Sequence, residues 1–225
     1  MMNLLSNLKI AVPEKIFLKD PESSQLGKRI VESSVQLIDE IGFENFTFKK
    51  LGAKIGSNES SIYRYFESKH KLLLYLSSWY WAWTEYQLVL STHNLADKHQ
   101  KLTKAIEILT RTVEQDSNFS HIDEIALHRI IVNENSKSYL TKEVDEENKD
   151  GYFVIYKRLV GRLSEMIVEV NPKYTHSYTL ASTIIEGALH QHFLKDHFKT
   201  ITNCNKEVTP SSFFIDLTTT ILKAN

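Results

Sequence analysis

The chain has few of the residues that stabilise small secreted proteins or that build turn-rich folds. It contains one cysteine, Cys204, among 225 residues, so no disulfide can form within it. A lone thiol fits the reducing cytosol, and we expect a cytoplasmic protein. Seven glycines and four prolines are too few for many short strands and tight turns, whereas long stretches repeat their apolar residues with the period of a helix. The sequence therefore predicts an all-α fold.

Long apolar runs and catalytic motifs are missing as well. No stretch approaches the roughly 20 apolar residues that cross a bilayer, and the apolar residues of segment 1–17 alternate with Asn3, Asn7, Lys9 and Glu14. We expect neither a secretory signal nor a membrane span. No glycine-rich phosphate loop, paired-carboxylate motif or Ser/His/Asp order appears. We therefore expect no enzyme, no cofactor and no membrane partner.

The net charge of -1 hides an uneven distribution of charge. Residues 23–71 contain eight basic and six acidic side chains, whereas residues 72–225 contain sixteen basic and nineteen acidic ones. Only the first of these segments is suited to meet the phosphates of a nucleic acid.

The first helix of this basic segment is recognisable from a single apolar face. Its residues recur with helical spacing, at Ile30, Ser34, Leu37, Ile38 and Ile41. Gly42 follows directly and is expected to end the helix, since glycine readily adopts the left-handed conformation of a C-terminal cap.

Two shorter helices are predicted next. Thr47 is placed to cap the second helix, whose buried stripe consists of Phe48, Leu51, Gly52 and Ile55. After Gly56, Asn58 is placed to cap a third helix from about residue 59 to residue 66. Two short helices joined by a tight, glycine-containing turn form a helix-turn-helix, and its second helix reads the major groove of DNA.

The third helix is predicted to face DNA. Ile62 and Phe66 share its buried side, which leaves on the outer side and its flanks Ser60, Ser61, Tyr63 and Arg64. An outward arginine can hold guanine O6 and N7 with two hydrogen bonds. Tyr65, beside the buried edge, is expected to place its ring against the domain and its hydroxyl on a phosphate.

The fourth helix begins with positive charge. Ser68 is expected to cap it, and its first turn carries Lys69, His70 and Lys71. Cations are unfavourable at the positive end of a helix dipole, so an outside anion such as a DNA phosphate explains them better than helix stability does. We expect Lys69 in particular to contact the DNA backbone.

Residues 29–74 resemble the DNA-binding domain of the tetracycline-repressor (TetR) family of bacterial transcriptional regulators. The residues that carry the resemblance are the pattern from Ile30 to Ile38, Gly42-Phe43, Thr47, Leu51-Gly52, the run from Ser61 to Phe66, Ser68-Lys69 and Leu72-Leu73. The resemblance implies a three-helix helix-turn-helix domain followed by a larger helical ligand-binding and dimerisation domain, with about nine helices in total. It further implies a homodimer, paired through its last two long helices, that binds a palindromic double-stranded DNA operator. Such proteins are most often repressors that a small-molecule effector releases.

Three positions depart from the family's usual pattern. Gly52 replaces an alanine, which keeps packing close but costs up to about 1 kcal/mol of helix propensity. Asn58 replaces a serine cap, which is an even exchange. Glu59 stands where the family often has an uncharged or basic residue. It either accepts a hydrogen bond from cytosine N4 or, in the favoured interpretation, simply stabilises the helix N-terminus.

The candidate DNA contacts are Thr47, Asn58, Glu59, Ser60, Ser61, Tyr63, Arg64, Tyr65 and Lys69. Thr47 also has a purely structural explanation, because capping alone accounts for it. The exposed lysines of the second helix are explained by a solvated helix face, and Arg64, Tyr65 and Lys69 are preferred to them as contacts.

The rest of the chain is predicted as helices without local motifs. They cover residues 68–93, 97–116, 120–134, 137–170 with a possible break near Gly151, 174–199 and 210–223. We expect an N-terminal extension at 1–22, the helix-turn-helix domain at 23–70, and the ligand-binding and dimerisation domain at 71–225. The apolar stripes of the last two helices fit either a dimer interface or a monomer core. The extension is too apolar for a free basic arm and is expected to pack on the body or on a neighbour.

Two clusters in the body are candidates for ligand sites. Trp79, Trp83 and Tyr86 share one helix face and could wall an apolar ligand pocket, although ordinary core packing is the favoured interpretation. The second cluster shares a face with metal-ligand spacing and consists of His121, Glu124 and His128. Three polar residues on one face are more often a solvated surface, and no fourth ligand is evident, so we expect no metal site.

Three classes of function follow from these observations. The leading one is a ligand-responsive DNA-binding regulator. A regulator without a small-molecule effector, either constitutive or controlled by a protein partner, is its rival. A helical metal-binding protein or enzyme, whose front end is merely structural, is the least favoured.

Overall fold

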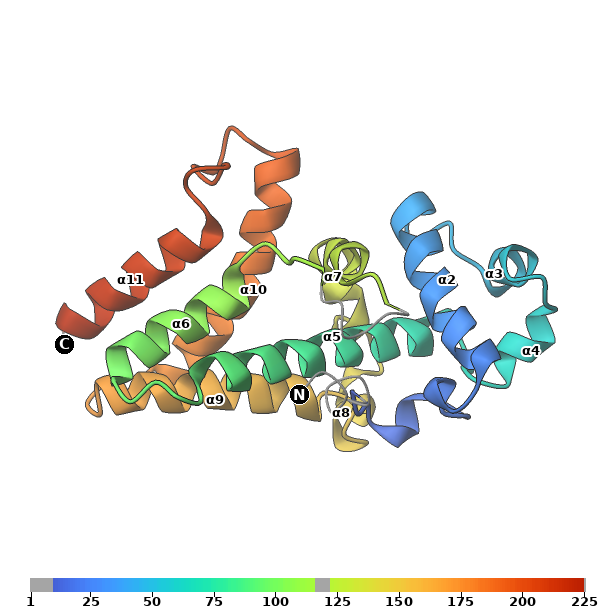
Figure 1. Ribbon diagram of the computed structural model, residues 1–225, viewed down its shortest axis with the longest axis horizontal. Helices are drawn as coiled ribbons and strands as arrows, with labels where there is room; N and C mark the ends of the chain where they lie inside the picture. The colour runs from blue at the N-terminus through green and yellow to red at the C-terminus, as the bar shows by residue number, and fades with distance from the viewer. Residues whose placement is uncertain (1–9, 116–121, 225) are drawn as a thin grey trace. The chain divides into compact units, whose positions relative to one another are not determined.

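The computed structural model describes residues 10–115 and 122–224 (Figure 1). Over these residues it contains no strand, so the prediction of an all-α fold is confirmed. Two short 3-10 helices, η1 (Glu14–Ile16) and η2 (Pro21–Ser23), precede the α-helices. The α-helices are α2 (Gln25–Ile41), α3 (Phe48–Lys54), α4 (Glu59–Tyr63), α5 (Lys69–Thr92), α6 (Lys98–Thr110), α7 (Glu124–Tyr139), α8 (Val144–Lys149), α9 (Val154–Val170), α10 (Ser177–His197) and α11 (Pro210–Ala224).

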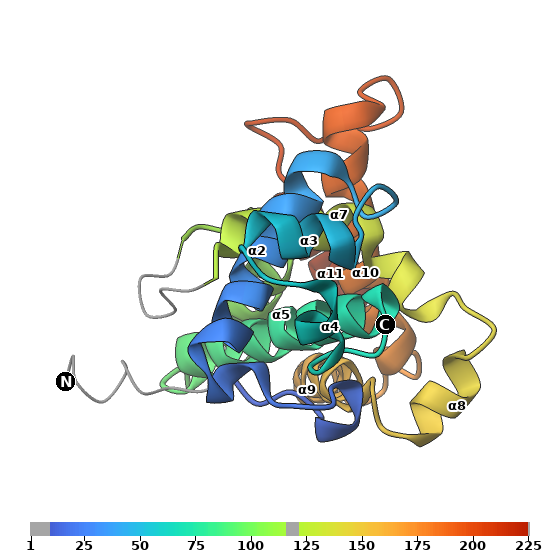
Figure 2. The same ribbon diagram turned by 90° about the vertical axis from the view of Figure 1, so that its right-hand side faces the viewer.

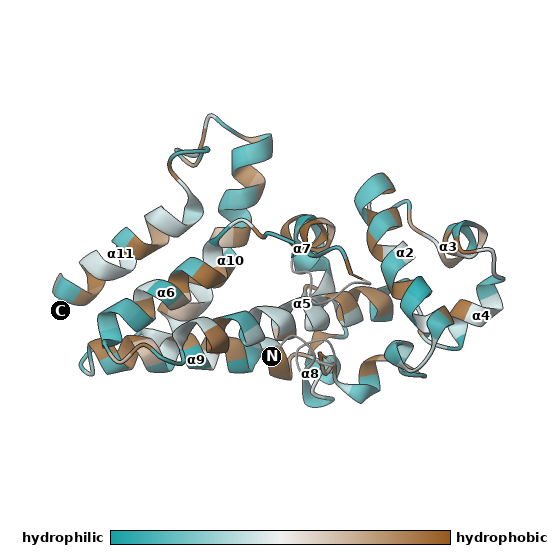
Figure 3. Ribbon diagram, viewed as in Figure 1, coloured by the Kyte–Doolittle hydropathy of each residue, from teal (hydrophilic) through white to brown (hydrophobic). Residues whose placement is uncertain are grey.

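The predicted caps form the ends of the first helices. The N–H of Gly42, at φ 76°, donates to Ile38 O and ends α2. Thr47 Oγ1 accepts from Lys50 N (3.2 Å) at the start of α3, and Asn58 Oδ1 accepts from Ser61 N (2.8 Å) at the start of α4. Teal and brown alternate along α2 in Figure 3, which reflects its one buried face. The three-helix arrangement is confirmed.

The third helix is shorter than predicted and ends at Tyr63 instead of residue 66. The amides of Tyr65 and Phe66 both donate to Ile62 O (2.8 and 3.1 Å), which tightens the chain into a turn. This turn places both rings in the core, with 3% and 0% of their surfaces exposed.

The later helices also differ in their bounds from the sequence prediction. α6 ends at Thr110 instead of residue 116, because Arg111 is extended and the Thr110 carbonyl is bound by the buried side chain of His192. α7 begins at Glu124, where Asp123 Oδ1 accepts from Ala126 N. The break near Gly151 (φ 86°) is confirmed, and it separates α9 from α8, a short helix that sequence reading did not resolve. The described residues therefore hold ten α-helices where about nine were expected.

The chain forms two compact units, and the limits of the DNA-binding and ligand-binding domains stay a prediction. The first unit comprises residues 1–82 and 113–154. Within its described part, α7 packs on α2 of the helix-turn-helix. Two ion pairs fasten α7 to α2 and the residues after it: Arg129 with Asp39, through bonds of 2.8 and 2.6 Å, and Lys137 with Glu44 at 2.6 Å.

The second unit comprises residues 83–112 and 155–225. Helices α6, α10 and α11 pack on one another in it. The buried carboxylate of Glu85, from the second half of α5, receives hydrogen bonds from Arg158 and Arg162 of α9. Burial alone would raise the pKa of Glu85, but the two guanidinium groups outweigh it and lower that pKa. No helix among the described residues is long and apolar enough to cross a membrane.

Candidate nucleic-acid interface

Helix α4 presents a small polar surface from the helix-turn-helix. Ile62 is fully buried and fixes the rotation of the helix. Ser60, Tyr63 and Arg64 are consequently exposed, as the helical spacing predicts. Glu59 and Ser61 are half-buried beside them, and the Ser61 hydroxyl donates to Asn58 Oδ1 (2.7 Å). The outer face of α4 therefore exposes a guanidinium (Arg64), a phenol (Tyr63) and a small hydroxyl side chain (Ser60) that could enter a DNA groove.

Tyr63 is exposed but held in place. Its ring meets the buried ring of Phe48 edge to face, with 5.0 Å between the centroids, while 46% of the residue stays exposed. A rigid aromatic side chain loses little entropy when it contacts a partner. Tyr63 is thus a well-positioned contact residue beside Arg64.

Helices α3 and α4 approach each other at Gly52. A Cβ atom there would lie 2.8 Å from Ser57 O and 3.4 Å from Glu59 N, both of them backbone atoms. The Ser57 amide also donates to Gly52 O (2.9 Å). The glycine that departs from the family pattern is therefore required by the close approach of this turn.

Helix α3 begins after the candidate Thr47 and carries three lysines. Thr47 is exposed and caps the helix, so its amide and hydroxyl lie at the surface. Lys50 Nζ donates to Asn45 O (2.8 Å), and Lys54 Nζ lies 3.4 Å from Glu40 Oε2. Lys49 is exposed on the same helix.

Tyr65 packs its ring against the domain as predicted, but its hydroxyl does not stand free. The hydroxyl lies 2.8 Å from Ser24 Oγ, the N-cap of α2. The Ser24 hydrogen bond, together with the nearby charges of Lys19 and Arg64, lowers the pKa of Tyr65 against the effect of burial. Contact between this hydroxyl and DNA remains a prediction, and it would have to share the oxygen with Ser24.

Lys69 makes its hydrogen bonds within the first unit. Its Nζ donates to the carbonyls of Phe43 (3.1 Å) and Glu44 (3.3 Å) and lies 4.8 Å from the centroid of the Phe43 ring. Lys69 thus ties the first turn of α5 to the loop after α2. This internal role accounts for the lysine whether or not it also meets a phosphate.

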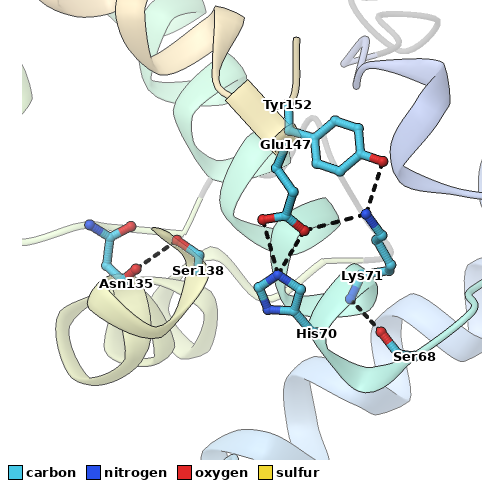
Figure 4. Close-up of polar contacts among 7 residues, drawn as sticks. All are labelled: Ser68, His70, Lys71, Asn135, Ser138, Glu147 and Tyr152. Carbon is cyan, nitrogen blue, oxygen red and sulfur yellow. Dashed lines mark hydrogen bonds and ion pairs between the residues drawn. The ribbon is translucent and has the colours of Figure 1, made fainter. Parts of the chain in front are cut away.

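The other two side chains of that turn, His70 and Lys71, have an internal partner in a carboxylate, which corrects the sequence interpretation that they require an outside anion. Figure 4 shows Glu147 of α8 between His70 and Lys71. His70 Nε2 lies 3.0 Å from Glu147 Oε1, and Lys71 Nζ lies 3.4 Å from the same oxygen and 2.9 Å from Tyr152 Oη. Burial would lower the pKa of Lys71, but the contacts with Tyr152 and Glu147 raise it. Sequence reasoning missed Glu147 because no local signal joins it to a turn 76 residues away.

The aromatic residues of α5 are mostly core. Trp79 is 1% exposed in the first unit and Trp83 is 3% exposed in the second, whereas Tyr86 is half-buried. This burial is what the packing interpretation expects. A ligand pocket walled by these three residues stays a prediction.

The metal candidate is only partly inside the described residues. His121 lies outside them. Glu124 is fully buried and accepts a hydrogen bond from Gln115 Nε2, and His128 Nδ1 lies 2.9 Å from Tyr80 Oη. In residues 10–115 and 122–224, no three His, Cys, Asp or Glu side chains are grouped so that they could hold a metal ion.

Comparison with known proteins adds a family match and a shared fold. Residues 30–76 match the family model "Bacterial regulatory proteins, tetR family". A comparison with curated proteins finds no match. The chain is similar to a Saccharomonospora viridis structure described as a transcriptional regulator in complex with choline (TM-score 0.58, 18% identity, 88% of this chain and 95% of that one). It is also similar to AibR in complex with isovaleryl coenzyme A and operator DNA (0.55, 16%, 87% and 97%).

A third similar structure has a different description. It is a superantigen, PfiT, with a TM-score of 0.59 and 15% identity, and the match covers 92% of this chain and all of that one. At such identities the likeness shows the fold alone, and one fold can serve several functions. The function must therefore be argued from the residues of the interface.

Proposed function

We propose that the chain binds a palindromic operator as a homodimer, since its residues 30–76 match the family model of the tetR-type bacterial regulatory proteins. It represses transcription there until a small-molecule effector releases it. The observation that carries the proposal is the exposed face of α4, with Ser60, Tyr63 and Arg64 outward from a capped and tightly packed helix-turn-helix.

Each residue of this face has a distinct task. Arg64 reads a base edge, guanine being the best match for its two parallel donors. Ser60 lets the helix approach the groove closely, and Tyr63 contacts the backbone or a thymine methyl from its fixed position on Phe48. Thr47 supports this reading from α3 with a phosphate contact.

The homodimer is supported by α10 and α11. Both helices leave large apolar side chains exposed, with Tyr178 64% and Phe213 46% exposed. Such residues are suited to bury against a second copy, as the family resemblance implies. Two recognition helices set about 34 Å apart would then read the two halves of a palindrome.

The effector is supported by a cavity of about 390 Å³ in the second unit, between α6 and α11. Leu102 and Ile106 of α6 and Leu222 of α11 give it apolar walls. Thr218 also lines it, and its buried Oγ1 has no hydrogen-bond partner among the described residues. An unsatisfied buried hydroxyl costs free energy, so a small ligand with one polar group would be stabilised there.

Selection of bound fragments from random duplex DNA tests the proposal. We expect recovery of one motif with two-fold symmetry, protected over both half-sites in footprinting, and a dimer in sedimentation. A selection that enriches no motif would contradict operator binding. An asymmetric motif would contradict the homodimer.

A regulator without an effector is the competing function. A thermal-shift screen followed by footprinting separates the two, because a compound that stabilises the protein and abolishes its footprint would exclude the competitor. The variant Thr218→Val should lose the response to that compound if the cavity between α6 and α11 is its site, while operator binding stays intact.

A further inference from the structure

The N-terminal extension, meaning its described residues 10–22, is part of the first unit and not a loose arm. Ile16 is 1% exposed, and Leu18 N donates to Tyr65 O (2.8 Å). Pro21 lies so close to α2 that a Cβ at Gly27 would be 2.2 Å from Pro21 O. Figure 2, which looks onto α3 and α4, shows this dark-blue segment running beside α4 and the start of α2. The extension therefore has a fixed position next to the recognition helix.

Lys19 lies where the extension contacts Tyr65, the residue that follows Arg64. Its Nζ is 5.1 Å from the centroid of the Tyr65 ring, and it is exposed. The ring cannot turn away, because the Tyr65 hydroxyl is held by Ser24 Oγ and the Tyr65 carbonyl by Leu18 N. The charges of Lys19 and Arg64 both contribute to the lowered pKa of the Tyr65 hydroxyl.

Lys19 differs from the neighbouring lysines because no carboxylate of the described residues pairs with it. Lys15 of the same extension pairs with Asp150 at 2.7 Å, and Lys28 of α2 lies 4.0 Å from Glu22. Among the described residues, Lys19 has no ion pair with a carboxylate, and its contact is the aromatic face of Tyr65. An exposed, unneutralised ammonium beside a recognition helix is suited to a backbone phosphate.

We propose that the N-terminal extension is part of the DNA-binding surface and that Lys19 contacts a backbone phosphate in each half-site. Tyr65 then acts as a positioning residue: its ring holds the lysine, and Ser24 holds the ring. The inference rests on the proposed DNA-binding function and adds to it a contact from outside the helix-turn-helix. It also gives the extension a role that its composition does not suggest, since residues 1–22 of the sequence balance three lysines with three acidic residues.

The test compares Lys19→Gln with Lys15→Gln, a lysine of the same extension that is paired with Asp150. The dissociation constants of the full-length protein for the selected operator and for a random duplex are measured at several salt concentrations. For Lys19→Gln, we expect the same fold-loss on both duplexes and a log-log salt dependence shallower by about 0.9 per subunit. Lys15→Gln should bind like wild type, and Lys19→Arg should restore most of the affinity.

Each other outcome has a separate meaning. If wild type binds DNA but Lys19→Gln keeps its affinity and salt dependence, the inference is wrong and the proposed function stands. A loss confined to the operator would overturn the phosphate assignment, since phosphates carry no sequence information. Failure of wild type to bind any duplex would instead overturn the proposed function. Equal thermal unfolding of both glutamine variants and wild type is required, so that a folding defect does not imitate the loss.

Discussion

His70 and Glu147 lie 77 residues apart in the chain, yet His70 Nε2 is 3.0 Å from Glu147 Oε1 and 3.3 Å from Glu147 Oε2. The same carboxylate lies 3.4 Å from Lys71 Nζ, and its side chain is only 7% exposed. Since the first turn of α5 follows the recognition helix closely, α8 helps to fix the element on which that helix is anchored.

Replacing Glu147 with glutamine should destabilise the protein. The substitution keeps the shape of the side chain but takes a charged acceptor away from two cationic or potentially cationic donors in a buried position. We expect the free energy of unfolding to fall by about 1.5 to 3 kcal/mol, the range for hydrogen bonds to charged groups. Urea unfolding followed by circular dichroism measures the change.

The neighbouring Glu146 supplies the control. Its side chain is 77% exposed and pairs with Lys149 in the same short helix. Exposed pairs of this kind contribute little, so Glu146→Gln should change the stability by less than about 0.5 kcal/mol. Equal effects of the two substitutions would show that the buried contact with His70 and Lys71 is not the cause.

Arg64→Ala should relax sequence preference at one position of each half-site. Without the outward guanidinium, one base edge of each half-site is no longer read. We expect the binding free energy to weaken by about 1 to 3 kcal/mol on the operator and little on random duplex. Competition binding with single-base operator variants measures the discrimination. The exposed Lys49 is the control, because a loss there should be equal on every sequence. If Arg64→Ala discriminates between bases as wild type does, α4 does not read DNA through this residue.

The caps and the contacts of the first unit differ in how far they could be predicted from the sequence. Thr47 and Asn58 bond to amides three residues away, so their roles follow from local spacing. Lys69 bonds to a carbonyl 26 residues away and Tyr65 to a hydroxyl 41 residues away. Those partners are set by how α2 and α5 pack and not by any periodicity. The same holds for Lys19, whose contact with Tyr65 depends on the path of the whole extension.

Gly52→Ala should destabilise the helix-turn-helix although alanine favours helices. The added Cβ would lie 2.8 Å from Ser57 O, so the turn between α3 and α4 must move. We expect a net loss of about 1 to 3 kcal/mol, which exceeds the gain of up to about 1 kcal/mol in helix propensity. Operator affinity should fall too, since the displaced turn carries α4. Urea unfolding and operator titration measure the two effects.

Gly161 of α9 is the matched control for that substitution. A Cβ there would meet only Tyr178 Oη, at 3.9 Å, which is an ordinary contact. Gly161→Ala should therefore stabilise the protein by about 0.5 to 1 kcal/mol through helix propensity. A stabilising effect at Gly52 as well would show that the turn between α3 and α4 can absorb a methyl group.

His192 should make the stability depend on pH. It is 5% exposed, its Nε2 lies 2.9 Å from Thr110 O, and burial lowers its pKa below the ordinary 6.5 despite the opposing effect of that hydrogen bond. Below about pH 6.5, His192 therefore takes up a proton more readily in the unfolded chain than in the folded protein. The stability due to this group is complete above pH 6.5 and declines as the pH falls towards the folded-state pKa, by at most about 1.4 kcal/mol per pH unit.

The variant His192→Gln isolates this contribution, because its amide can still donate to Thr110 O but does not titrate. Unfolding midpoints measured from about pH 7.5 to about pH 5.5 should fall more for wild type than for His192→Gln. His190→Gln, on the exposed side of the same helix, should keep the pH dependence of wild type. If His192→Gln loses as much stability on acidification as wild type does, another group causes the decline, and the buried contact between α10 and the end of α6 tolerates a charged imidazole.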